Sequence, residues 1–199
     1  MSIKNTCFLD VYVWDTVYLR GEAGHVSVAV RRLNKFEKLI KRRYFGFWPH
    51  REFSALDVPF HFPAVEKLTL DEEVWYEEND PLFIPNKHYA IAINEEQFTK
   101  VEREINDQST NIRSGKTRYT WLSSINHIFY NTFDWRTYFQ KKEPINLENC
   151  STIAVKIMNA GGVPIKRNNL LWGISPVAVS HQLDHLITQN KITAIRSAF

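Results

Sequence analysis

One cysteine and one histidine in this chain stand where a thiol nucleophile and its base could be built. Cys150 follows Asn149, a good N-cap residue, so we expect it in the first turn of a helix running to Ala160. Unpaired N–H groups and the helix dipole there favour a thiolate and can bind an oxyanion. His25 begins an alternating, strand-like run, and a strand beside a helix N-terminus can bring an imidazole to a thiol.

Each residue has a simpler explanation when taken alone. Cys150 fits a small buried side chain, and His25 fits a polar residue on an edge strand. The wider context comes from three segments, Gly24–Val28, Tyr44–Pro49 and Asn149–Gly162. Together they resemble the circularly permuted NlpC-type, papain-like cysteine hydrolases, a branch that includes the lecithin:retinol acyltransferase group. In that branch the histidine strand precedes the cysteine helix, as it does here.

The resemblance implies a role for each matched residue. Cys150 would be the nucleophile, and His25 the general base that takes the thiol proton and later protonates the leaving group. The family usually carries a third, orienting polar group on the strand after the histidine, where His50 is the candidate by position. Asp10, Asp15 and Glu52 are the other candidates.

Three tryptophans and a histidine pair have weaker functional interpretations. Trp48, Trp172 and Trp14 could line a substrate cleft, or they could be ordinary core and rim aromatics. His181 and His185 lie four apart on an expected helix, but neither a third ligand nor a His-Glu-x-x-His motif accompanies them. We therefore expect no metal and, without a phosphate-binding glycine motif, no cofactor.

The secondary structure expected around the candidate site residues predicts a single α+β domain spanning 1–199. Its antiparallel sheet is expected to pack against the helix that carries Cys150. Strands are expected at 7–19, 25–30, 43–48 and 88–93, and helices at 95–106, 149–160 and 176–186. Prolines and an acidic cluster predict an irregular, exposed excursion over 51–85, with a short strand near 66–70. The stretch 108–142 is expected to form a loop or lid.

The composition of the chain limits the binding partners and the cellular compartment that we expect. The chain is 44% hydrophobic with a net charge of +3, which is typical of a folded protein and gives no sign of nucleic-acid binding. The basic stretch 38–43 could touch a phosphate or an anionic membrane, although a solvated turn between two strands is the simpler interpretation. Two cysteines, no signal peptide and no membrane span predict a soluble, reduced protein that is cytoplasmic as synthesised or exported by a specialised secretion system.

These features together predict a cysteine-dependent hydrolase that cleaves an amide or peptide bond through an acyl-enzyme. Its expected partners are peptide, protein or acyl-lipid substrates, and its expected setting is that of a bacterial effector or toxin. A lipid acyl hydrolase, an acyltransferase or a deamidase on the same fold are alternatives. A binding module without catalytic activity is the alternative from another class, and it predicts that His25 and Cys150 lie far apart.

Overall fold

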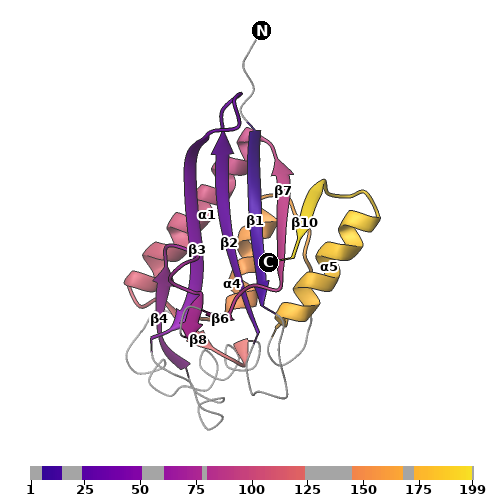
Figure 1. Ribbon diagram of the computed structural model, residues 1–199. Coiled ribbons are helices and arrows are strands. Elements are labelled where there is room, and N and C mark those ends of the chain that lie inside the picture. The colour runs from indigo at the N-terminus through magenta and orange to yellow at the C-terminus, as the bar shows by residue number, and fades with distance from the viewer. Residues whose placement is uncertain are drawn as a thin grey trace.

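The computed structural model describes residues 6–14, 24–50, 61–77, 80–123, 145–167 and 173–198. Within these residues lie an eight-stranded sheet, a two-stranded ribbon and three helices, an α+β architecture (Figure 1). The helices are α1 (Glu95–Arg113), α4 (Cys150–Ala160) and α5 (Pro176–Thr188). The strands are β1 (Thr6–Trp14), β2 (His25–Leu33), β3 (Leu39–Pro49), β4 (His61–Lys67), β5 (Trp75–Glu77), β6 (Asp80–Phe83), β7 (Lys87–Ile93), β8 (Thr117–Thr120), β9 (Asn146–Glu148) and β10 (Ala194–Ser197).

The large sheet has the strand order β10-β7-β1-β2-β3-β4-β8-β9. Its centre is the predicted antiparallel meander, which is confirmed: Val11 pairs with Val28, and Val28 pairs with Phe45. The pair β8–β9 is parallel, and Tyr119 of β8 lies opposite Glu148 of β9. Because β9 leads directly into α4, this pairing fixes where that helix begins.

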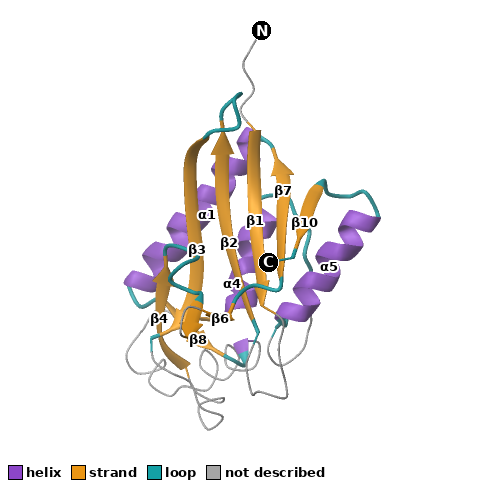
Figure 2. Cartoon of the chain, viewed as in Figure 1, coloured by secondary structure: helices purple, strands orange, loops and turns teal. Residues whose placement is uncertain are grey.

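One face of the sheet forms the main core. Successive strand residues point to opposite faces, so Val26 and Val28 of β2 share a face with Val11 and Val13 of β1. Helices α1 and α4 cover this face, as Figure 2 shows. Their buried contributions are Phe98, Val101 and Ile105 from α1 and Ile153, Ile157 and Met158 from α4. Each such side chain contributes about 1.5–3 kcal/mol by leaving water.

The opposite face carries a second, smaller cluster. Tyr12, Trp14, Ala29 and Tyr44 are buried there, and Leu70 from the connection between β4 and β5 packs against them. A loop rather than a helix therefore covers this part of the sheet. His25 and Ser27 alternate with Val26 and so face this second cluster.

Two expected irregular segments contain regular structure. Helix α1 follows the predicted cap residue Asn94 but continues to Arg113, because Ser109 and Ile112 extend its buried stripe beyond residue 106. Residues 117–120 form β8, and 61–67 form β4 where a strand was expected near 66–70. Residues 51–60 and 124–144 lie outside the described part. Among the described residues, no helix is both long and apolar enough to cross a membrane.

Candidate active site

Cys150 is the first residue of α4, as its sequence predicts. The side chain of Asn149 accepts a hydrogen bond from the backbone N–H of Thr152 at 2.8 Å, and Thr152 Oγ1 accepts one from the N–H of Asn149 at 2.9 Å. This reciprocal capping box fixes the start of the helix. The Cys150 side chain is buried, with the hydroxyl of Ser151 at 3.9 Å from its sulfur.

His25 begins β2 on the face opposite α4 and yet influences the ionisation of Cys150. Its imidazole and the backbone N–H of Val26 are close enough to the thiol to lower the pKa of Cys150. The two side chains come near each other at the first residue of β2, where the strand no longer separates the two faces. The ring is buried, with Trp48 stacked on it at a centroid distance of 4.1 Å and Trp14 tilted against it at 5.1 Å.

Glu73 supplies the third polar group. Its Oε1 lies 3.3 Å from His25 Nε2 and accepts a bond from Trp48 Nε1 at 2.8 Å. Its Oε2 accepts a bond of 2.5 Å from the hydroxyl of Tyr44. Because Tyr44 has one proton and gives it to Glu73, the hydroxyl of Ser27 is the donor in the 2.5 Å Ser27–Tyr44 bond. The carboxylate is thus fully engaged at 1% exposure.

Gly46 makes room for Glu73. A Cβ added at Gly46 would stand 1.5 Å from Glu73 Oε1, well inside any real contact distance. The short connection between β4 and β5 can therefore lay the carboxylate directly over the backbone of β3. No other residue type at position 46 leaves the Glu73 side chain where it is.

The charges of His25, Cys150 and Glu73 stabilise one another. Burial alone would lower the pKa of His25, but the Glu73 carboxylate and the Cys150 thiolate raise it to about 9. Burial would raise the pKa of Cys150, but the charge and hydrogen bond of His25 and the N–H of Val26 bring it below its usual value. Burial likewise opposes ionisation of Glu73, and His25, Tyr44 and Trp48 outweigh it to lower its pKa. The arrangement favours the charged form of each of the three groups.

Tyr119 is a fourth residue at the thiol. It is buried on β8, and its ring stacks on Phe47 at a centroid distance of 5.4 Å. Burial, followed by the neighbouring Cys150, raises the pKa of this phenol well above its usual value, so it remains a proton donor. The parallel pairing of β8 with β9 brings it there, since its partner Glu148 lies two residues before Cys150.

The predicted third residue needs correction. His50 is exposed at the end of β3, and the partner of His25 is Glu73. Asp10 is buried elsewhere, bonded to Arg31 at 2.7 Å and to His88 at 2.9 Å. Asp15, Glu52 and the predicted cleft residue Trp172 lie outside the described residues.

Glu73 and Tyr119 were not identified from the sequence. Glu73 sits in the acidic cluster expected to be exposed; its neighbours Asp71 and Glu72 are exposed, whereas Glu73 is buried. Nothing in the local sequence separates the three. Only the register of Gly46 and the path of the loop select Glu73, and only the register of β8 with β9 selects Tyr119.

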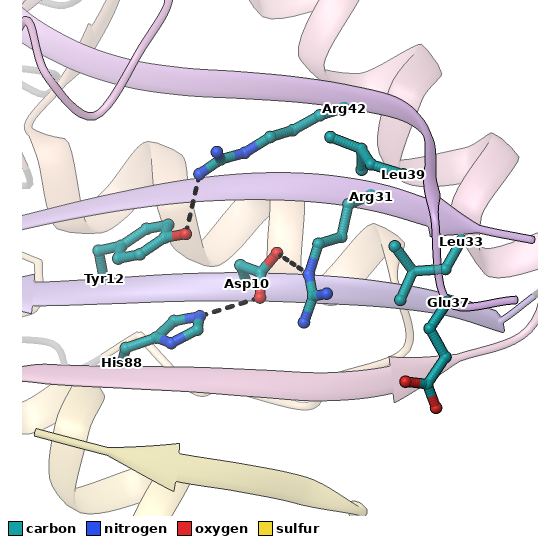
Figure 3. A pocket seen from close by; sticks show the side chains of 8 residues that line it. All are labelled: Asp10, Tyr12, Arg31, Leu33, Glu37, Leu39, Arg42 and His88. Carbon is teal, nitrogen blue, oxygen red and sulfur yellow. Dashed lines mark hydrogen bonds and ion pairs between the residues drawn. The ribbon is translucent and has the colours of Figure 1, made fainter.

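A shallow pocket lies on the same face of the sheet, and neither His25, Glu73 nor Cys150 lines it (Figure 3). Its volume is about 320 Å³, and its polar groups mainly pair with each other: Asp10 with Arg31 and His88, and Arg42 with Tyr12 at 3.0 Å. His181 and His185 are exposed on α5, and in the part of the chain that the structure describes no three His, Cys, Asp or Glu side chains form a group that could hold a metal ion.

Comparisons with protein-family models, with curated proteins and with solved structures give no match to this chain. The structure defines an α+β protein in which a buried histidine–glutamate pair lies beside a buried cysteine and lowers its pKa.

Proposed function

We propose that the protein is a cysteine-dependent hydrolase with a permuted papain-like arrangement, which cleaves an amide or peptide bond through an acyl-enzyme. The observation that carries the proposal is the buried His25–Glu73 pair at 3.3 Å, beside a buried Cys150 whose pKa His25 lowers. A binding module needs no such row of charged groups. The order of a histidine strand before a cysteine helix, on an antiparallel sheet, supports the same class.

In the first half-reaction the Cys150 thiolate attacks the substrate carbonyl carbon. The resulting oxyanion is bound by N–H groups at the start of α4 and by the hydroxyl of Tyr119. The His25 imidazolium gives its proton to the leaving nitrogen, the C–N bond breaks, and a thioester with Cys150 and a free amine remain.

In the second half-reaction neutral His25 takes a proton from water, and the hydroxide formed attacks the thioester carbon. Collapse of this intermediate breaks the C–S bond, releases the carboxylic acid and restores the thiolate beside the imidazolium. Glu73 stabilises the charged ring in both steps without itself taking the proton. Attack on an ester or a carboxamide would follow the same steps, with an alcohol or ammonia as the leaving group.

Electrophilic probes with peptide, ester and thioester recognition groups test the proposal. We expect a covalent adduct on the Cys150 peptide, detected by mass spectrometry, in the wild type and in the control variant Cys7→Ala. Cys150→Ala should give no adduct, and His25→Ala should slow it strongly. Labelling that does not depend on His25, or that favours Cys7, would contradict the proposal.

A further inference from the structure

The turn between β2 and β3 exposes apolar side chains. Phe36 is 69% exposed, Leu39 56% and Ile40 52%, and these are three of the five exposed large hydrophobic residues among the described ones. Leu39 and Ile40 are consecutive on a strand and so point to opposite faces, yet both are exposed. The end of this hairpin therefore extends beyond the layers that cover the rest of the sheet, as Figure 1 also shows.

The same hairpin carries an excess of positive charge. Residues 31–43 include seven basic side chains and one acidic side chain, Glu37. Four of the seven have a carboxylate partner: Arg31 with Asp10, Arg32 with Glu95, Lys41 with Glu102 and Arg43 with Glu66. Among the described residues, the other three have no carboxylate partner: Lys35, Lys38 and Arg42.

The turn is held in one conformation. The side-chain oxygen of Asn34 accepts bonds from the N–H groups of Phe36 and Lys38 at 2.9 and 3.0 Å, and the N–H of Asn34 bonds the carbonyl of Lys38 at 2.9 Å. Glu37 takes the left-handed conformation that closes the turn, with φ of 59°. Binding through Phe36 should therefore cost little further conformational entropy in the turn.

We propose that this hairpin docks the protein on an anionic lipid bilayer, with Phe36, Leu39 and Ile40 entering the interface and Lys35, Lys38 and Arg42 meeting the headgroups. Aliphatic and aromatic tips flanked by cations suit that boundary, where apolar burial and headgroup attraction add. A narrow convex tip buries these side chains between lipids without needing a shaped partner surface. Nucleic acid would match the charge but gives Leu39 and Ile40 nothing to bind.

Docking by the hairpin would keep the thiol away from the bilayer. His25 and Leu33 are the two ends of β2, nine residues long, so they lie about 26 Å apart. If the proposed hydrolase activity holds, a docked enzyme would reach a protein or peptide at the membrane surface rather than an acyl chain inside it.

Vesicle sedimentation tests the proposal with the full chain. We expect the wild type to bind vesicles of phosphatidylcholine mixed with phosphatidylserine, and to bind phosphatidylcholine alone at least about tenfold more weakly. The variants Lys35→Glu with Lys38→Glu, and Phe36→Ser with Ile40→Ser, should each reduce binding to the mixed vesicles at least about tenfold. All four positions are exposed or in the turn, and circular dichroism would verify the fold.

The matched controls are Ile195→Ser, which removes the 70% exposed apolar side chain of β10, and Lys191→Glu, which reverses another exposed charge; both should bind as the wild type does. Cys150→Ala should also bind normally, which separates this proposal from the catalytic one. No binding to either vesicle, equal binding to both, or equal loss in the hairpin and control variants would overturn the proposal.

Discussion

The two faces of the central sheet differ in what they bury. The face under α1 and α4 is apolar: Val11, Val26 and Val28 are at most 1% exposed and meet helix side chains of the same kind. The face under the β4–β5 connection buries His25, Ser27 and Glu73 to a similar degree, each with a hydrogen-bond partner. The two faces are therefore buried to a similar degree but with different results. On one face burial stabilises the fold, and on the other it sets the protonation states of the buried polar side chains.

The proposed chemistry needs both faces. Cys150 belongs to a helix of the apolar face, while His25 and Glu73 belong to the polar one. They come together only because His25 is the first residue of β2, so at that point the strand does not separate the two faces of the sheet. A helix packed anywhere else along β2 would present its N-terminus to valine side chains.

The largest expected effect is that of His25→Ala. It removes the charge that stabilises both Cys150 and Glu73, so we expect activity to fall by about 10³-fold or more. Leaving a buried carboxylate without its counter-charge should also cost about 3–5 kcal/mol in the free energy of unfolding. Probe turnover and urea denaturation measure the two effects.

The matched control for this variant is His88→Ala. His88 also bonds a buried carboxylate, that of Asp10, on the same face. Its loss should destabilise the protein while the labelling rate at Cys150 stays the same. Equal loss of labelling in both variants would show that any damage to this face inactivates the protein.

Gly46→Ala should have the next largest effect, because its Cβ would displace the carboxylate of Glu73. We expect a loss of about 1–3 kcal/mol in the free energy of unfolding, together with a rise in the pH at which Cys150 becomes reactive. The double variant with Glu73→Ala tests the cause. Once the carboxylate is gone, Gly46→Ala should cost much less, and fully additive costs would argue against this contact.

A pair of variants should separate the faces directly. Ile105→Ala on the helix side should cost about 2–5 kcal/mol by leaving a cavity, with no change in the pH profile of labelling. Tyr44→Phe on the polar side should cost less, about 1–3 kcal/mol, but should shift that profile, because Glu73 loses a donor. Thermal or urea unfolding measures the change in stability, and labelling of Cys150 across pH measures the shift of the profile. Identical pH profiles in the two variants would contradict the distinction between the two faces.

The smallest expected effect is that of His50→Ala. His50 is exposed and Glu73 holds the position beside His25. Labelling should be unchanged and stability should change by no more than about 0.5 kcal/mol. A strong loss of labelling would restore His50 as the orienting residue.

The parts of the site that the sequence predicts depend on local signals. The Asn149 cap and the alternation after His25 place Cys150 at a helix start and His25 at a strand start, and short-range physics alone fixes both. The meander of β1, β2 and β3 follows from the same alternation. Helix α1 was underestimated because polar Gln108 and Ser109 lie on its buried face.

The parts that escaped prediction depend on long-range register. Glu73 reaches His25 only because the loop after β4 folds back over Gly46, 27 residues earlier in the chain. Tyr119 reaches Cys150 only through the parallel pairing of two short strands. No periodicity within either segment records these contacts, so a charged cluster was expected to be exposed and a strand was expected to be a loop.

The most direct test of the central claim, a thiolate held by His25, is the pH dependence of iodoacetamide alkylation at Cys150, followed by mass spectrometry. Cys7 is the internal reference, since burial, the largest influence, raises the pKa of its thiol. Because His25 lowers the pKa of Cys150, the alkylation of Cys150 should reach its plateau below the titration of an ordinary thiol near about 8.5.

The imidazolium should persist until its pKa of about 9, so this plateau should extend to that pH, and Glu73→Gln should move its lower limb to higher pH. Alkylation of Cys150 that rises only near the ordinary thiol pKa, and that is unaffected by Glu73→Gln, would contradict the account.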